Sequence, residues 1–296
     1  MTALRALLAG LVDYAGLFPP AALNMESAVR QYAAYSASDQ AWMLGRFVVP
    51  AAHLDAFRDA QATLPNQPEW HLSALVGADV EADIDRVHSF NNAMATNNAM
   101  AARAHIDTIE GKATTDAAVT RIADCASGFR AFVEIPVTDF EPLLDAIRDR
   151  GLNAKIRTGG VSREMFPEPE ALLRFIEHAC RENVPFKATA GLHHALRGDY
   201  RLTYDEDAPR GPMFGFLNVF LTAAFVHAGM TDGAALALLL ERDLKKISVS
   251  SNAIRWGNRS ITTDDIHAAR DCVAMSFGSC SFLEPVDELR AAALLQ

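Results

Sequence analysis

Residues 131–192 read AFVEIPVTDFEPLLDAIRDRGLNAKIRTGGVSREMFPEPEALLRFIEHACRENVPFKATAGL, and this stretch decides the fold. Short apolar or β-branched runs alternate in it with segments of helical periodicity. The first such segment repeats apolar residues at i, i+3, i+4 and i+7 from Phe140 to Ile147, and Gly151 follows at the position of a C-terminal cap. This alternation predicts parallel strands joined by crossover helices.

The same pattern extends along the chain in both directions. We predict eight strands, at residues 11–16, 46–50, 71–77, 105–111, 131–137, 153–160, 185–192 and 273–279. Eight βα units in 296 residues favour an α/β fold of the (β/α)8 TIM barrel type, with residues 1–296 forming a single domain. An open doubly wound sheet is disfavoured because no predicted strand is followed by the glycine fingerprint of a dinucleotide fold.

The segment between the seventh and eighth strands, at about 195–271, is too long for one crossover. Apolar runs at 216–226 and 232–241 predict two helices, and Gly257-Asn258 predicts the turn of a hairpin. We therefore expect a helical and hairpin insertion there, serving as a lid or as an oligomer contact. Its apolar helices favour a homo-oligomer.

The overall charge and hydropathy limit the partners. With 27 Lys+Arg against 37 Asp+Glu, the net charge is −10, which argues against nucleic acid and against anionic membranes. The longest apolar stretch, 214–230, is too short to span a bilayer and predicts a buried helix. No secretory signal is evident at the N-terminus, and the four cysteines have the dispersed spacing of free thiols. We expect a cytoplasmic protein.

Two lysines occupy matching places in the sixth and seventh strands. Because side chains alternate along a strand, Lys155 and Arg157 are predicted to face the barrel interior, as are Lys187 and Thr189. Neighbouring strands lie about 4.8 Å apart, so the two ammonium groups are expected to meet. A second ammonium favours the neutral form of the first, and a neutral lysine attacks carbonyls. The pattern predicts a Schiff-base enzyme that needs no organic cofactor.

Carboxylates for proton transfer occur on the fourth and fifth strands. Asp107 and Glu110 have opposite parity, so only one faces inward unless the strand carries a bulge, while Glu134 is predicted to face inward. Asp13, near the end of the first strand, either joins the site or pairs with a barrel lysine. The alternative is a purely structural network in which these carboxylates neutralise the lysines.

The motifs Lys155-x-x-Thr158-Gly159 and Lys187-Ala188-Thr189-x-Gly191, preceded by Ile106-Asp107, resemble the deoxyribose-phosphate aldolase family of class I aldolases. The resemblance covers about residues 105–191 and extends weakly to Gly278-Ser279. It implies a TIM barrel in which Lys155 forms the Schiff base, Lys187 makes that lysine less basic, and Asp107 transfers protons. Two departures concern substrate recognition. Arg157 replaces a small polar residue, and Gly191-Leu192-His193-His194 replaces the phosphate loop.

We therefore expect a carbon–carbon lyase acting on a small aldehyde, ketone or oxo acid, with Arg157 available for a carboxylate or phosphate on the substrate. The expected substrate-binding residues are Arg157, Thr158, Thr189, His193, Gly278 and Ser279. One alternative is a metal-assisted hydrolase or lyase using His193 or His194. Consecutive side chains point apart, however, so we expect no metal. The other alternative is a non-catalytic barrel that binds a small acidic metabolite or a protein partner.

Overall fold

Eight parallel strands close into a barrel in the computed structural model, which describes residues 2–65, 69–96, 104–231 and 233–295. The order around the barrel is β1-β13-β7-β6-β5-β4-β3-β2. This confirms the predicted (β/α)8 fold and all eight predicted strands. The barrel strands are β1 (Val12–Tyr14), β2 (Leu44–Pro50), β3 (Trp70–Leu75), β4 (Ala104–Lys112), β5 (Arg130–Ile135), β6 (Asn153–Arg157), β7 (Phe186–Thr189) and β13 (Ala274–Ser279).

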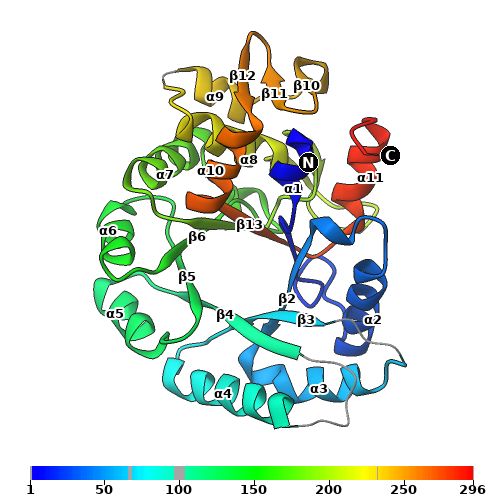
Figure 1. Cartoon of the computed structure of the whole chain (residues 1–296), viewed down its shortest axis with the longest axis vertical. Coiled ribbons are helices and arrows are strands. Elements are labelled where there is room, and N and C mark those ends of the chain that lie inside the picture. Colours follow the sequence, from blue (N-terminus) through cyan, green and yellow to red (C-terminus); the bar gives the residue numbers. More distant parts are fainter. Residues whose placement is uncertain (1, 66–68, 97–103, 232, 296) are drawn as a thin grey trace.

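Helices surround the barrel as an outer layer (Figure 1). They are α1 (Ala3–Leu8), α2 (Met25–Ser36), α3 (Leu54–Ala62), α4 (Val80–Thr96), α5 (Asp116–Cys125), α6 (Glu141–Asp149), α7 (Pro169–Glu182), α8 (Phe216–His227), α9 (Gly233–Leu239), α10 (Thr263–Cys272) and α11 (Leu283–Ala291). Single 3₁₀ turns are η1 (Ala41–Met43), η2 (Ala51–His53), η3 (Arg163–Met165) and η4 (Leu244–Lys246). The apolar stripe of α6 is buried as predicted, and Gly151 follows the helix with a left-handed φ of +65°.

The insertion lies between β7 and β13, where the sequence places it. It begins with the hairpin β8 (Gly198–Arg201) and β9 (Arg210–Met213) and ends with the small sheet β10 (Ile247–Val249), β11 (Ala253–Trp256) and β12 (Arg259–Thr262). The predicted turn at Gly257-Asn258 joins β11 to β12. Its two predicted helices are α8 and α9, although Asp232 lies outside the described residues. Because α8 packs Phe220 on Phe277 of β13, this helix belongs to the barrel's outer layer.

Most of the hydrophobic core lies between the barrel and its helices. Ala154 and Ile156 of β6 are fully buried there, as alternation predicts. Phe186 of β7 contacts Phe175 of α7 and Phe220 of α8, so this side of β7 also faces the helices. Lys155 and Arg157 of β6 and Lys187 and Thr189 of β7 consequently point into the barrel.

The apolar stretch 214–230 forms α8, whose side chains are almost all buried, which confirms the expected core helix. None of the described helices combines the length and apolar character needed to cross a bilayer. The four cysteines are free thiols, as predicted.

Candidate functional site

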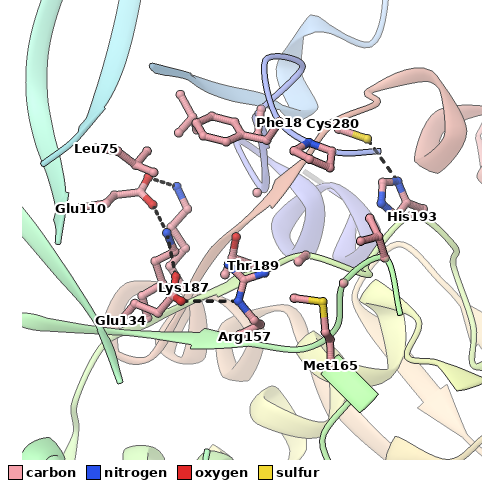
Figure 2. A pocket seen from close by; sticks show the side chains of 18 residues that line it. Phe18, Leu75, Glu110, Glu134, Arg157, Met165, Lys187, Thr189, His193 and Cys280 are labelled. Atoms are coloured by element: carbon pink, nitrogen blue, oxygen red, sulfur yellow. Dashed lines mark hydrogen bonds and ion pairs between the residues drawn. The ribbon is translucent and has the colours of Figure 1, made fainter. Parts of the chain in front are cut away.

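A cavity of about 240 Å³ opens at the carboxyl ends of the barrel strands, the face where TIM barrels hold their active sites. Figure 2 shows Glu110 and Glu134 on one side of it and His193 with Cys280 on the other. Among the predicted site residues, those that line it are Glu134, Lys155, Arg157, Lys187, Thr189, His193 and Gly278. Apolar side chains, among them Phe18 and Met165, complete the wall.

Lys155 lies between two carboxylates on the cavity wall. Its Nζ is 2.8 Å from Glu110 Oε2 and 3.3 Å from Glu134 Oε2, and its side chain is 7% exposed. Each partner comes from a different strand, so β4, β5 and β6 together position one amine. The amine is paired, yet it borders open space that a small molecule could enter.

Lys187 lies opposite Lys155 in the register of β6 and β7 but is more deeply buried. Its Nζ is 2.7 Å from Asp13 Oδ2 and 2.5 Å from Glu110 Oε1. Burial alone would lower the pKa of Lys187, but Asp13 and Glu110 raise it above its usual value. The two carboxylates therefore favour the charged form of Lys187, and of the two possibilities left open for Asp13 the structure shows the pairing with a barrel lysine.

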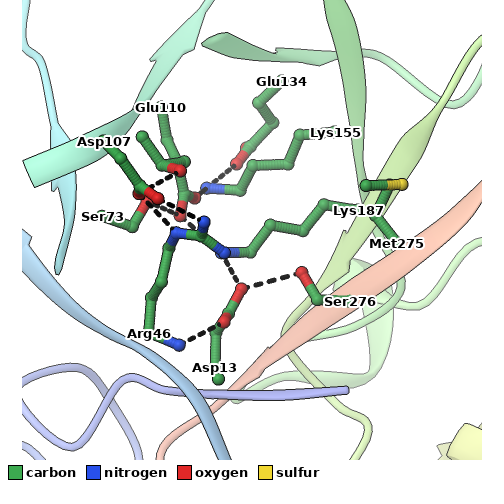
Figure 3. A network of polar contacts seen from close by, with 12 residues as sticks. Asp13, Arg46, Ser73, Asp107, Glu110, Glu134, Lys155, Lys187, Met275 and Ser276 are labelled. Atoms are coloured by element: carbon green, nitrogen blue, oxygen red, sulfur yellow. Dashed lines mark hydrogen bonds and ion pairs between the residues drawn. The ribbon is translucent and has the colours of Figure 1, made fainter. Parts of the chain in front are cut away.

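Glu110 joins the two lysines, as Figure 3 shows, and also accepts a hydrogen bond of 2.6 Å from the Ser73 hydroxyl. Burial alone would raise the pKa of the Glu110 carboxyl, but the ammonium groups of Lys155 and Lys187 hold it far below its usual range. The two lysines thus meet, as predicted, but through a carboxylate that compensates both charges.

The structure corrects the expected position of Asp107. The β3–β4 pairing passes from Leu72↔Ile106 to Ser73↔Thr108, so Asp107 forms a bulge. The bulge allows both Asp107 and Glu110 to reach the interior. Asp107 pairs with Arg46 through two hydrogen bonds of 2.7 and 2.6 Å and does not line the cavity. Glu110, three residues later, lines the cavity and contacts both Lys155 and Lys187.

Glu134 and Arg157 lie side by side on the cavity wall. Arg157 Nε is 3.5 Å from Glu134 Oε1, and 43% of the Arg157 side chain is exposed. Burial alone would raise the pKa of Glu134, but Lys155 and Arg157 lower it. Arg157 therefore has one weak internal partner and can turn its guanidinium toward a bound anion.

Two of the expected substrate-binding residues hold the loops around the cavity instead of lining it. The Thr158 hydroxyl is buried and donates to the Ala190 carbonyl oxygen over 2.6 Å, which ties the end of β6 to the loop after β7. The Ser279 hydroxyl accepts a hydrogen bond from the Ser281 backbone N–H at 3.3 Å. Both residues are therefore placed to support the cavity.

His193 and His194 point to different partners, as expected for consecutive residues. His193 Nδ1 lies 2.9 Å from Glu284 Oε2, whereas His194 contacts Glu288 and stacks on Tyr200. Burial alone would lower the pKa of His193, but hydrogen bonds to Cys280 and Glu284 raise it to about 10. Within the described ranges, no three His, Cys, Asp or Glu residues are grouped to hold a metal ion. The metal-assisted alternative thus gains no support.

Sequence reasoning missed Cys280 as a cavity residue. Its Sγ lies 3.5 Å from the Tyr204 hydroxyl and 4.0 Å from His193 Nδ1, and the three residues come from separate segments. The only sequence signal was its position directly after the eighth strand, where barrel sites form.

Compared with known proteins, the chain matches no family model and no curated protein.

Proposed function

We propose that this cavity is the active site of a carbon–carbon lyase of the class I aldolase type, in which Lys155 forms a Schiff base with a small carbonyl compound. The observation that carries the proposal is the position of Lys155 Nζ, 2.8 Å from Glu110 and 3.3 Å from Glu134, on the wall of a cavity at the catalytic end of the barrel. An amine in contact with a proton acceptor is the arrangement that Schiff-base chemistry needs.

The first step moves a proton from the Lys155 ammonium to Glu134. We assign this proton to Glu134 because its two cationic partners are farther away, at 3.3 and 3.5 Å, than the two ammonium groups at 2.8 and 2.5 Å from Glu110. The neutral amine adds to the substrate carbonyl and forms a carbinolamine. Glu134 then returns the proton to the carbinolamine oxygen, which leaves as water and gives a protonated imine.

The imine then accepts the electron pair of the bond that breaks. Glu134, again a carboxylate, takes the proton of the substrate's β-hydroxyl group, and the bond between the α and β carbons breaks. The β carbon leaves as an aldehyde, and the bonding pair forms an enamine on Lys155. Protonation of the enamine at carbon, followed by hydrolysis, releases the second carbonyl product and restores the amine.

Lys187 acts in this scheme as a positioning residue. Because it stays charged and contacts Glu110 at 2.5 Å, it keeps Glu110 anionic, and Glu110 in turn holds Lys155 at the cavity wall. Arg157 supplies a guanidinium for a substrate carboxylate or phosphate, and a cavity of about 240 Å³ limits the substrate to a small molecule. A short hydroxylated oxo acid fits these features best.

Reductive trapping tests the proposal. Sodium borohydride is added to the full-length protein with acetaldehyde, dihydroxyacetone or pyruvate, and the modified peptide is identified by mass spectrometry. The chain has five lysines, at positions 112, 155, 187, 245 and 246, so the labelled residue can be assigned directly. We expect a stable secondary amine on Lys155 with at least one compound, at concentrations that leave the exposed Lys245 unmodified.

Lys155→Arg is the matched variant, because arginine retains the positive charge between Glu110 and Glu134 but forms no imine under these conditions. It should abolish trapping, whereas Lys245→Arg should leave it unchanged. Equal labelling of all accessible lysines, or none on Lys155 with any carbonyl tested, would overturn the proposal and favour a non-catalytic barrel that binds a small acidic metabolite.

A further inference from the structure

A second cavity lies at the opposite, amino end of the barrel strands. Its volume is about 140 Å³, several times the ~30 Å³ that one water molecule occupies in the liquid. Three arginines from three different elements line it, namely Arg46 of β2, Arg130 of β5 and Arg270 of α10, together with Asp13 of β1. Such a concentration of guanidinium groups contrasts with the net charge of −10 carried by the whole chain.

Two of the charges around this cavity are already compensated. Arg46 forms its bidentate ion pair with Asp107, and Asp13 is paired with Lys187 at 2.7 Å. Asp13 also accepts hydrogen bonds from the Ser276 hydroxyl and the Arg46 backbone N–H. The ion pair of the Asp13 carboxylate is thus with Lys187, and within the described structure Asp13 forms no salt bridge with Arg130 or Arg270.

Arg270 has no carboxylate partner among the described residues. Its guanidinium donates instead to backbone carbonyl oxygens, to Ala274 at 2.5 Å, to Ala9 at 2.8 Å and to Met275. Burial lowers the pKa of Arg270 to about 10, against the weaker opposing effect of Asp13. The carbonyl groups satisfy its hydrogen bonds but leave its positive charge without a counter-charge.

Arg130 contributes the second uncompensated charge. It is exposed at the first position of β5, and within the described part of the chain its side chain takes part in no hydrogen bond or ion pair. With Arg46 and Asp13 already paired, Arg130 and Arg270 leave an excess of two positive charges at one cavity.

We propose that the amino-end cavity binds a small oxyanion of the phosphate class. Two uncompensated guanidinium groups match the charge of a phosphate dianion. Arg130 can bind such an ion by donating two parallel hydrogen bonds, whereas Arg270, whose terminal nitrogens already donate to carbonyl oxygens, contributes its charge. The site is separate from the cavity at the carboxyl ends of the strands, which contains Lys155 and is called the upper cavity below. Its ligand contacts none of the residues to which the lyase chemistry is assigned.

Isothermal titration of the full-length protein with inorganic phosphate at low ionic strength tests this site. We expect saturable binding of one phosphate per chain, with a Kd on the order of 1 mM or below. Arg130→Gln should weaken binding at least tenfold. Arg130→Lys should weaken it less, because lysine keeps the positive charge but lacks the two parallel N–H donors of a guanidinium. Arg255→Gln, at an exposed arginine of β11, should bind like the wild type.

Arg157→Gln distinguishes this site from the upper cavity. It should leave phosphate binding unchanged, and Arg130→Gln should leave borohydride trapping on Lys155 unchanged. The proposal is overturned if the wild-type protein shows no saturable phosphate binding, if Arg130→Gln binds as well as Arg255→Gln, or if Arg157→Gln alone abolishes binding. None of these results bears on the Schiff-base chemistry of Lys155.

Discussion

The Lys187 ammonium lies 2.7 Å from the Asp13 carboxylate inside the barrel, where its side chain is 1% exposed. Replacing one member of a buried ion pair leaves the other charge without compensation. In this protein two carboxylates, Asp13 and Glu110, depend on the same ammonium. Lys187 is therefore expected to matter for stability as much as for the site.

Lys187→Met should lower the free energy of unfolding by about 3–5 kcal/mol, the usual cost of breaking a buried pair. Urea denaturation followed by circular dichroism measures this change. The control is Lys245→Met at an exposed lysine, which should shift stability by no more than about 0.5 kcal/mol. A loss below about 1 kcal/mol for Lys187→Met would mean that water or rearrangement compensates the two carboxylates.

Asp107→Asn should leave the rate of borohydride trapping within about twofold of the wild type, because Asp107 contacts Arg46 and not the cavity. Glu134→Gln should slow trapping about a hundredfold, the lower end of the usual contribution of a general acid–base. Trapping rates at a fixed carbonyl concentration compare the two variants. If Asp107→Asn were the slower of the two, proton transfer would belong to Asp107, as the family resemblance implies.

The His193–Glu284 pair should make the free energy of unfolding fall as the pH rises into the alkaline range. The pKa of His193, about 10 in the folded chain, lies above the value of about 6.5 for an unfolded histidine. Its contribution is therefore complete below about pH 6.5 and is lost as the pH rises toward about 10.

His193→Gln should abolish this slope, which amounts to at most about 1.4 kcal/mol per pH unit. Unfolding free energies measured in urea at several pH values from about 6 to 10 give the comparison. The exposed His53→Gln should retain the wild-type profile. Parallel profiles for the wild type and His193→Gln would show that His193 is not the titrating group.

Thr158→Val should cost about 1–2 kcal/mol, because valine keeps the shape but leaves the buried Ala190 carbonyl without its hydroxyl donor. It should nevertheless retain trapping on Lys155, since Thr158 does not line the cavity. The exposed Thr114→Val is the matched control for stability. Loss of trapping at unchanged stability would restore Thr158 to the substrate-binding role that the resemblance implies.

The sequence predicted the site best where strands are regular. Alternation along β6 and β7 placed Lys155 and Lys187 inside the barrel, because these two strands pair with each other without interruption. The same reasoning failed on β4. Parity allows either Asp107 or Glu110 to face inward, and only the bulge at Asp107 brings in both. Sequence periodicity carries no signal for a bulge, so it does not decide which of these two carboxylates faces the interior.

Contacts between residues that are far apart in the chain could not be predicted from sequence patterns either. The carboxylates of Glu284 and Glu288 on α11 hold His193 and His194 across some ninety residues. The cavity at the amino end of the strands gathers arginines from β2, β5 and α10, which share no motif. Such contacts follow from barrel closure, which brings the ends of all strands together, and not from any local property of the residues.

The line of alternating charges from Asp13 through Lys187 and Glu110 to Lys155 has a consequence for folding. The interiors of TIM barrels are usually filled by layers of bulky branched apolar residues. Here a slip of β6 or β7 by one residue would turn an ammonium group into the apolar shell beneath the helices. These alternating charges therefore favour the observed register of β6 and β7 and disfavour a register shifted by one residue.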